Sequence, residues 1–247
     1  MKRMSNINIT QGEYENLQKN IFQIGGEGII CKTDGRTLYK LFTDQMGNIT
    51  PMSENKQIKI INLYQKNLLY TVKPISTISY QGEIVGYQMT YNPYDCSLEN
   101  IALLDRKTLI KILKETKNVL EYFASEDITY GDITADNILV NIKTGAITFC
   151  DIDNMRVGTN KIDTLGSPLT RYYERTGTID AKADAYMHNL LTIKKLSCSN
   201  QYESEIIKDL RKGIYPTRFK QHAHQVFQSM TNPEKFNGEY VIKYIKR

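Results

Sequence analysis

Three polar side chains in one short stretch have the types and the spacing needed for metal-dependent chemistry. Asp132 and Asn137 precede an apolar run at residues 138–142, and Asp151 follows a second run at residues 146–150. Two such runs around a glycine-containing turn predict a β-hairpin, whose open end would make Asn137 and Asp151 neighbours. Amide and carboxylate oxygens suit Mg²⁺, which keeps part of its coordination shell for water and phosphate. Asp132 would face the same space as a base or as a carboxylate that orients a nucleophile.

The order Asp, five residues, Asn, hairpin, Asp resembles the catalytic loop and metal-binding segment of the protein kinase superfamily. The matching residues are Tyr-Gly-Asp132-Ile-Thr-Ala-Asp-Asn137 and Asp151-Ile-Asp153. This Gly-Asp form of the loop is closer to RIO-type and aminoglycoside-phosphotransferase-like kinases than to the His-Arg-Asp form. The resemblance implies that Asp132 and Asn137 are catalytic and that Asn137, Asp151 and Asp153 bind the metal. Taken alone, the stretch is also compatible with a polar turn and hairpin in an unrelated α+β protein.

A glycine cluster nearer the N-terminus predicts a loop that binds phosphate. Apolar runs flank Gly25-Gly26-Glu27-Gly28, and glycine lets backbone N–H groups approach an anion closely. The pair Asp34-Gly35 is a strong hairpin signal, and it places Lys40 on the returning strand. A cation at Lys40 could reach phosphates lying under the loop. Kinases share this order, so the resemblance adds Lys40 to the catalytic residues.

The resemblance also implies which residues surround a nucleotide. Ile30 and Leu38 would cover the adenine ring, Met89 would lie beside the pocket, and the backbone of Thr90 and Asn92 would be available to the adenine edge. The implied cofactor-binding residues are Gly25, Gly26, Gly28, Ile30, Leu38, Lys40, Glu54, Met89, Thr90, Asn92 and Leu139.

A helix is predicted after Thr50-Pro51, because threonine is a good N-cap and proline is favoured at the first helical position. Its expected apolar face consists of Ile58, Ile61, Leu63 and Tyr64. In a kinase this helix carries a glutamate that pairs with the strand lysine, and Glu54 is the carboxylate available for that role. Equally, Glu54 would complement the helix dipole from the first turn.

The elements that position these residues continue along the chain. Two strands are expected around Gln81-Gly82, followed by a proline-marked linker near Asn92. Asp105 is predicted to cap a long buried helix whose apolar positions recur at three and four residues. Residues 183–191 resemble the central helix of the larger kinase lobe, in which Asp184 would brace the catalytic loop.

The C-terminal part is predicted to contain a long loop and further helices. The polar, glycine-spaced residues 154–178 are expected to form a functional or mobile loop, which in a kinase would be the activation segment. Helices are predicted near Glu203–Arg211, 218–230 and 239–246. The histidines in or near these helices are expected to be structural or solvated.

Composition restricts the class of protein. The 32 basic and 27 acidic residues give a formal charge of +5, which is weak evidence for a nucleic-acid surface. The four cysteines, Cys31, Cys96, Cys150 and Cys198, are scattered and are expected to be reduced thiols. No signal-peptide pattern and no long apolar run are present. We therefore expect a cytoplasmic protein with no nucleic-acid and no membrane partner.

Together these features predict an α+β, two-lobed protein-kinase-like fold. Residues 1–91 would form an N-lobe with an antiparallel sheet plus one helix, and residues 92–247 would form a mainly helical C-lobe. The implied function is that of a bacterial eukaryotic-like kinase, a phosphotransferase that uses ATP and Mg²⁺, or Mn²⁺, to phosphorylate Ser or Thr hydroxyls of a protein substrate. The alternatives are a pseudokinase that signals by binding nucleotide and a small-molecule kinase of the aminoglycoside-phosphotransferase type.

Four departures from the kinase pattern bear on activity. Gln23 stands at the first loop glycine, Tyr130-Gly131 replaces His-Arg, and Thr134 replaces a lysine that contacts the transferred phosphate in many protein kinases. Asp153 replaces the glycine of Asp-Phe-Gly, where it could join the metal site or stiffen the loop. The four residues whose loss usually marks a pseudokinase are all present: Lys40, Asp132, Asn137 and Asp151.

Overall fold

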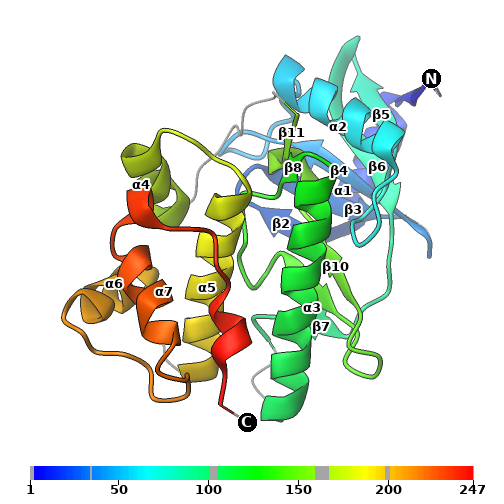
Figure 1. The fold of residues 1–247 in the computed structure, drawn as a ribbon. Coiled ribbons are helices and arrows are strands. Elements are labelled where there is room, and N and C mark those ends of the chain that lie inside the picture. The colour runs from blue at the N-terminus through cyan, green and yellow to red at the C-terminus, as the bar shows by residue number, and fades with distance from the viewer. Residues whose placement is uncertain (1–2, 34, 101–104, 159–166, 198–200, 247) are drawn as a thin grey trace. The chain divides into compact units, whose positions relative to one another are not determined.

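The computed structural model describes residues 3–33, 35–100, 105–158, 167–197 and 201–246 (Figure 1). The chain divides into two compact units. Unit 1 consists of Met1–Pro93 and Thr148–Asp153, and unit 2 consists of Tyr94–Ile147 and Asn154–Arg247. The described residues contain a six-stranded sheet and seven α-helices, so the predicted α+β class is confirmed. The sequence did not predict that residues near Asp151 would belong to the N-terminal unit.

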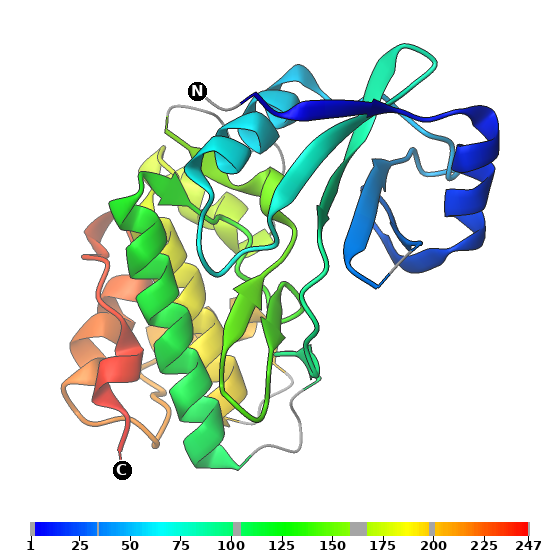
Figure 2. The same ribbon diagram turned by 90° about the vertical axis from the view of Figure 1, so that its right-hand side faces the viewer.

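Unit 1 is built on the six-stranded sheet, in the order β1-β5-β6-β4-β3-β2. The strands are β1 (Ser5–Asn8), β2 (Ile21–Gly25), β3 (Gly28–Lys32), β4 (Thr37–Phe42), β5 (Pro74–Tyr80) and β6 (Glu83–Thr90). β1 runs parallel to β5, whereas the other described strand pairs are antiparallel (Figure 2). The sheet is therefore mixed, whereas the sequence predicted a wholly antiparallel sheet. The parallel pair is possible because the intervening elements supply the long crossover that it needs.

The helix α1 (Gln11–Lys19) covers one face of this sheet and was not predicted. It begins at Thr10, whose side chain and that of Glu13 form a reciprocal capping box. Leu17 packs in a buried cluster with residues of β3 and β4, among them Ile29 and Leu41. The Thr-x-x-Glu spacing is a sequence signal for this helix.

The helix α2 (Glu54–Lys66) begins later than predicted and buries a different face. Ser53 is its N-cap, and the Ser53 hydroxyl accepts a hydrogen bond from the Lys56 N–H group, so Thr50 is not the cap. The buried positions are Lys56, Lys59, Ile60 and Leu63. Ile58, expected in the apolar face, is 43% exposed. The buried stripe keeps helical spacing, but two of its members are lysines.

Two long helices form the centre of unit 2. The helix α3 (Arg106–Ser125) begins at Asp105, whose carboxylate accepts from the Lys107 and Thr108 N–H groups, as predicted. The helix α5 (Ala181–Ser197) runs beside α3 and is buried around most of its circumference (Figure 1). His188 on α5 contacts the Leu113 carbonyl of α3 at 2.9 Å, so it is a buried structural residue.

Short strands flank the loop that contains Asp132 and Asn137. They are β7 (Cys96–Ser97), β8 (Ile128–Thr129), β9 (Ile138–Val140), β10 (Ile147–Phe149) and β11 (Arg156–Val157). The order β10-β9-β7 in one sheet confirms the predicted hairpin of β9 and β10. Its turn is closed by the Asn141 N–H group, which donates to the Ala146 carbonyl at 2.9 Å. β11 pairs with β8.

The remaining helices differ in several places from the predicted ones. The predicted loop at residues 154–178 contains β11 and the helix α4 (Ser167–Thr176), while residues 159–166 lie outside the described part. The helix α6 (Glu203–Arg211) has its predicted bounds, but α7 (Ala223–Met230) starts five residues later than expected. Residues 239–246 contain only the 3₁₀ helix η3 (Val241–Tyr244). None of the helices in the described ranges is long and apolar enough to span a bilayer.

Candidate functional site

The central strands of unit 1 place the predicted nucleotide-contact residues on one face of the sheet. Lys40 on β4 lies opposite Ile30 on β3 and Tyr87 on β6, and Leu38 lies opposite Met89. Directly opposed residues of neighbouring strands point to the same face, and so do residues two apart on one strand. Lys40 therefore shares a face with three of the predicted adenine contacts, Ile30, Leu38 and Met89.

Residues 148–153 join unit 1 through backbone hydrogen bonds. The Phe149 N–H group donates to the Tyr70 carbonyl at 2.7 Å, and the Val72 N–H group donates to the Phe149 carbonyl at 3.0 Å. Asp151 follows with φ 55°, a left-handed conformation that is uncommon for residues other than glycine. The short 3₁₀ helix η1 (Ile152–Asn154) begins directly after it.

Lys40 is the centre of a buried charged cluster. Its ammonium group forms ion pairs with Asp151 and with Asp153, the latter at 2.6 Å. Tyr87 donates its hydroxyl hydrogen to the same Asp153 oxygen at 2.9 Å. The cluster thus connects β4, β6 and the 148–153 segment within unit 1.

A second lysine, Lys56 of α2, completes the cluster. Its Nζ atom pairs with Glu27 in the turn between β2 and β3, and it lies 3.3 Å from Asp153 Oδ2. The Phe42 ring lies 4.8 Å from Lys56 Nζ and 5.4 Å from Lys40 Nζ. Lys56, Glu27 and Tyr87 were not identified from the sequence as members of this cluster. Lys56 in particular lies among polar helix residues, where a lysine is usually solvated.

The surroundings of the two aspartates shift their pKa values in opposite directions. Burial disfavours the carboxylate form of Asp153, but the ammonium groups of Lys40 and Lys56 hold its pKa far below the usual range. Burial raises the pKa of Asp151, an effect that Lys40 offsets only in part. Burial also lowers the pKa of Lys40, but the carboxylates of Asp153 and Asp151 raise it above its ordinary value. Lys40 therefore stays charged, and Asp151 protonates before Asp153.

The surroundings of Asp153 favour a role as counter-ion of two lysines over the predicted role as a metal ligand. Its side chain is fully buried, and both oxygens already accept from Lys40, Tyr87 or Lys56. The Asp151 side chain is 31% exposed and keeps access to solvent. Within the described residues, no group of three or more His, Cys, Asp or Glu side chains is arranged to hold a metal ion.

Glu54 does not occupy the position that pairing with Lys40 would need. It is exposed in the first turn of α2, whereas Lys40 is buried against two aspartates. The structure favours the alternative interpretation, in which Glu54 complements the helix dipole. The α2 side chain that reaches the cluster is Lys56, a residue of opposite charge.

The glycines of the β2–β3 turn differ in whether the structure has room for a side chain at their positions. A Cβ atom on Gly28 would lie 2.2 Å from the Leu41 carbonyl oxygen, so Gly28 is required by the close approach of β3 and β4. Gly25 and Gly26 have no left-handed φ, and a Cβ atom on Gly26 would meet nothing within 4 Å. A Cβ atom on Gly25 would lie 3.6 Å from the Gly28 carbonyl oxygen, an ordinary contact. Gly26 thus leaves open space in the turn that carries Glu27, which is compatible with the predicted approach of an anion.

The linker after β6 is only partly available to a ligand. The Thr90 N–H group donates to the Lys73 carbonyl at 2.9 Å, and the Lys73 N–H group donates to the Thr90 hydroxyl. This pairing uses the Thr90 N–H group, one of the Thr90 backbone groups that were expected to be available to an adenine edge. Asn92 lies past the end of β6, outside the sheet.

In unit 2, the predicted catalytic loop is held by two sets of hydrogen bonds. Asn137 Nδ2 donates to Asp132 Oδ2 at 2.8 Å, so the two predicted catalytic residues are in contact. The fully buried Asp184 accepts from the Tyr130 and Gly131 N–H groups at 2.8 Å each, which confirms the expected brace. Gly131 has φ 81°, a conformation that favours glycine.

The metal ligands predicted from the sequence belong to different units. Asn137 lies in unit 2 and Asp151 in unit 1, so their proximity remains a prediction. Leu139, a predicted cofactor-binding residue, is buried in β9 opposite Ser97 of β7.

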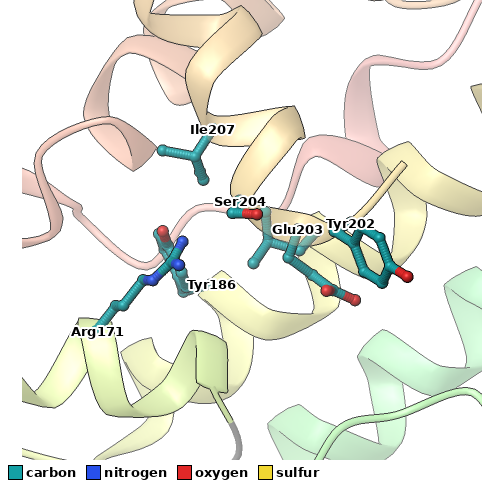
Figure 3. A pocket seen from close by; sticks show the side chains of 7 residues that line it. Arg171, Tyr186, Tyr202, Glu203, Ser204 and Ile207 are labelled. Carbon is teal, nitrogen blue, oxygen red and sulfur yellow. The ribbon is translucent and has the colours of Figure 1, made fainter.

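A separate cavity of about 180 Å³ in unit 2 contains none of the predicted residues. In Figure 3, Arg171 of α4 extends toward Tyr186 of α5 at one side, and residues of α6 form the other. Pockets for nucleotide-sized ligands are typically about 300–1,000 Å³. This cavity is therefore too small to be the predicted nucleotide site.

Comparison with models of protein families and with curated proteins finds no match for this chain.

Proposed function

We propose that the chain is an ATP- and Mg²⁺-dependent phosphotransferase of the kinase type, with unit 1 as its N-lobe and unit 2 as its C-lobe. Its acceptor is a Ser or Thr hydroxyl of a protein. The observation that carries the proposal is the partly buried ion pair between Lys40 on β4 and Asp151 after β10. By resemblance to kinases, these are the phosphate-binding lysine and the metal-binding aspartate.

Several features of unit 1 fit a nucleotide. The shared face of Ile30, Leu38 and Met89 provides apolar contact for a base. Open space at Gly26 and the ammonium group of Lys40 suit the phosphates. Asp151, whose side chain is partly exposed, would hold Mg²⁺ together with Asn137. When bound, the ion would neutralise charge on the phosphates.

In unit 2, the loop residues fit the handling of the acceptor. Asp132 would accept the proton of the acceptor hydroxyl, and the Asn137 amide fixes the orientation of the Asp132 carboxylate through the 2.8 Å hydrogen bond. Asp184 holds the backbone that precedes Asp132. Asn137 thus positions the Asp132 side chain, and Asp184 positions the backbone that precedes it.

A nucleotide-binding module without transfer is the second candidate. The observation in its favour is the pairing of Lys40 with two aspartates while Glu54 is exposed, a departure from the active kinase arrangement. Such a protein would bind nucleotide and Mg²⁺ but would transfer no phosphate.

A transfer assay with γ-labelled ATP, with and without added protein acceptors, tests the proposal. We expect Mg²⁺-dependent labelling of protein that is lost in Lys40→Met and kept in the control Lys66→Met, which changes an exposed lysine at the end of α2. Binding without labelling would favour the second candidate. Absence of nucleotide binding by the wild-type protein would refute both.

A further inference from the structure

Lys56 has two carboxylate partners that differ in how firmly they are held. Asp153 is fully buried and is also bound by Lys40 and Tyr87. The Glu27 side chain is 35% exposed and extends from a turn whose other residues include the exposed Gly25 and Gly26. Glu27 is therefore the partner of Lys56 that can exchange.

The Lys56 ammonium group itself is fixed in place. Its side chain is only 9% exposed, it lies on the buried face of α2, and it contacts both Asp153 and the Phe42 ring. A buried ammonium group that loses one anionic partner needs another anion, because an uncompensated buried charge is strongly unfavourable. A phosphate group would supply that anion.

We propose that Glu27 is an internal competitor of phosphate, and that phosphate displaces the Glu27 carboxylate from Lys56 when the ligand binds. This inference deepens the proposed function, since it rests on a nucleotide polyphosphate as the ligand. Lys56 then becomes a second phosphate-binding cation. It shares Asp153 and the Phe42 ring with Lys40, so the two ammonium groups serve one anion site.

The position of Glu27 between glycines makes the exchange sterically possible. A Cβ atom on Gly26 would meet nothing within 4 Å, so a phosphate group has room to approach the turn there, and the glycine N–H groups are unshielded by Cβ atoms. The Glu27 backbone carbonyl accepts from the Thr43 N–H group at 3.3 Å, so the exchange requires movement of the Glu27 side chain only. No covalent bond changes in this exchange; one anion replaces another at the ammonium group.

The substitution Glu27→Gln distinguishes competition from a merely structural role. Glutamine keeps the size of the side chain but removes the negative charge that repels and competes with phosphate. We expect the affinity for ATP and for tripolyphosphate to rise about three- to tenfold, and the affinity for adenosine to stay unchanged. If Glu27 only fastened the turn to α2, the same substitution would lower the affinity for all ligands.

The control is Glu83→Gln, which changes an exposed glutamate at another hairpin of the same sheet. We expect wild-type affinity for tripolyphosphate in this variant, measured by calorimetry at constant ionic strength. Thermal unfolding of each variant shows whether it is folded. A rise in affinity in Glu83→Gln as large as in Glu27→Gln would assign the effect to net charge and overturn the proposal.

A double-mutant cycle tests whether Glu27 acts through Lys56. Lys56→Met should weaken tripolyphosphate binding, and in that background Glu27→Gln should no longer raise the affinity. An equal rise in both backgrounds would contradict the exchange at Lys56. Because tripolyphosphate binding needs no transfer, failure of labelling in the kinase assay would leave this result standing. Failure of all proteins to bind tripolyphosphate would overturn the proposal whatever the transfer assay shows.

Discussion

Asp153 is the residue on which the charged cluster depends most. It is completely buried and forms ion pairs with two lysine ammonium groups, those of Lys40 and Lys56. Removing one partner of a buried ion pair leaves the other charge without compensation, and this is much more costly than loss of an exposed pair. The stability of the protein without ligand should therefore depend strongly on this carboxylate.

We predict that Asp153→Asn lowers the free energy of unfolding by roughly 3–5 kcal/mol. The matched variant Asp151→Asn, at a partly exposed side chain, should lower it by about 1 kcal/mol or less. Urea unfolding in the absence of nucleotide and Mg²⁺ measures both values. If Asp153→Asn is as stable as the wild type but binds Mg²⁺-nucleotide poorly, Asp153 is a metal ligand after all.

The predicted roles of Asp151 and Asp132 can be separated by measuring nucleotide binding and phosphate transfer in variants of each residue. Asp151→Asn should weaken Mg²⁺-nucleotide binding and transfer together, because it removes the proposed metal ligand. Asp132→Asn should leave binding nearly unchanged and lower turnover by about 10²- to 10⁴-fold, the usual range for a positioned general base. Nucleotide titration and labelled-phosphate transfer on both variants decide this. Equal loss of binding would mean that the roles are misassigned.

Two buried residues of α5 have pKa shifts with opposite consequences for stability. Burial raises the pKa of Asp184 from 3.8 to about 7, although two N–H groups donate to its carboxylate. The folded state then binds this proton more tightly, so the contribution of Asp184 to stability falls as pH rises from 3.8 to about 7. Burial lowers the pKa of His188 from 6.5 to about 4. Its contribution is present above pH 6.5 and is lost as pH falls toward about 4.

We therefore predict that the two contributions oppose each other between about pH 4 and 6.5. In Asp184→Asn, the His188 contribution remains, so the free energy of unfolding should rise with pH more steeply than in the wild type. In His188→Gln, the Asp184 contribution remains, and the slope should shift toward falling stability. Urea unfolding at several pH values in this range measures the slopes. Unchanged slopes in both variants would contradict the assignment.

At the scale of elements, strands β4 and β6 lie so close together at Gly86 that this position has no room for a side chain. A Cβ atom on Gly86 of β6 would lie 2.1 Å from the Lys40 carbonyl oxygen of β4. The positions of Lys40 and Tyr87, which are opposed across these strands, depend on this approach. Gly26 in the β2–β3 turn has no comparable restriction.

We predict that Gly86→Ala lowers the free energy of unfolding by about 1–3 kcal/mol, because β4 and β6 must separate to admit the methyl group. Gly26→Ala is the control and should leave stability within about 0.5 kcal/mol of the wild type. The same control should weaken ATP binding if the turn approaches phosphate. Chemical denaturation and nucleotide titration of both variants provide the measurements. Equal stability of Gly86→Ala and wild type would contradict the close approach of these strands.

At the scale of the whole molecule, each unit has its own buried core and its own set of charged contacts. The ion pairs of Lys40 are made within unit 1, and the hydrogen bond between Asn137 and Asp132 is made within unit 2.

We predict that nucleotide with Mg²⁺ stabilises the full chain by mass action. At a ligand concentration about 100-fold above the dissociation constant, the gain is roughly 2.7 kcal/mol. A rise in melting temperature with ATP and Mg²⁺ measures it, and Lys40→Met should abolish the rise. Absence of a shift in the wild-type protein at millimolar ATP with Mg²⁺ or Mn²⁺ would count against the phosphotransferase assignment.

Local sequence signals determined much of the architecture. Asp105 caps α3 because its side chain meets N–H groups two and three residues away, a relationship contained in the sequence alone. The β9–β10 hairpin follows from two apolar runs around a glycine turn. The contact between Asp132 and Asn137 also spans only five residues. Such features are predictable because the interacting groups are close along the chain.

The charged cluster was decided only by tertiary structure. Lys56 meets Asp153 across 97 residues of sequence, and Lys40 meets it across 113. The pattern of α2 suggested an isoleucine-rich buried face, but the actual buried stripe includes Lys56, since nearby carboxylates make its burial possible. Whether a charged side chain can be buried depends on the charges brought beside it by folding, and no local pattern contains that information.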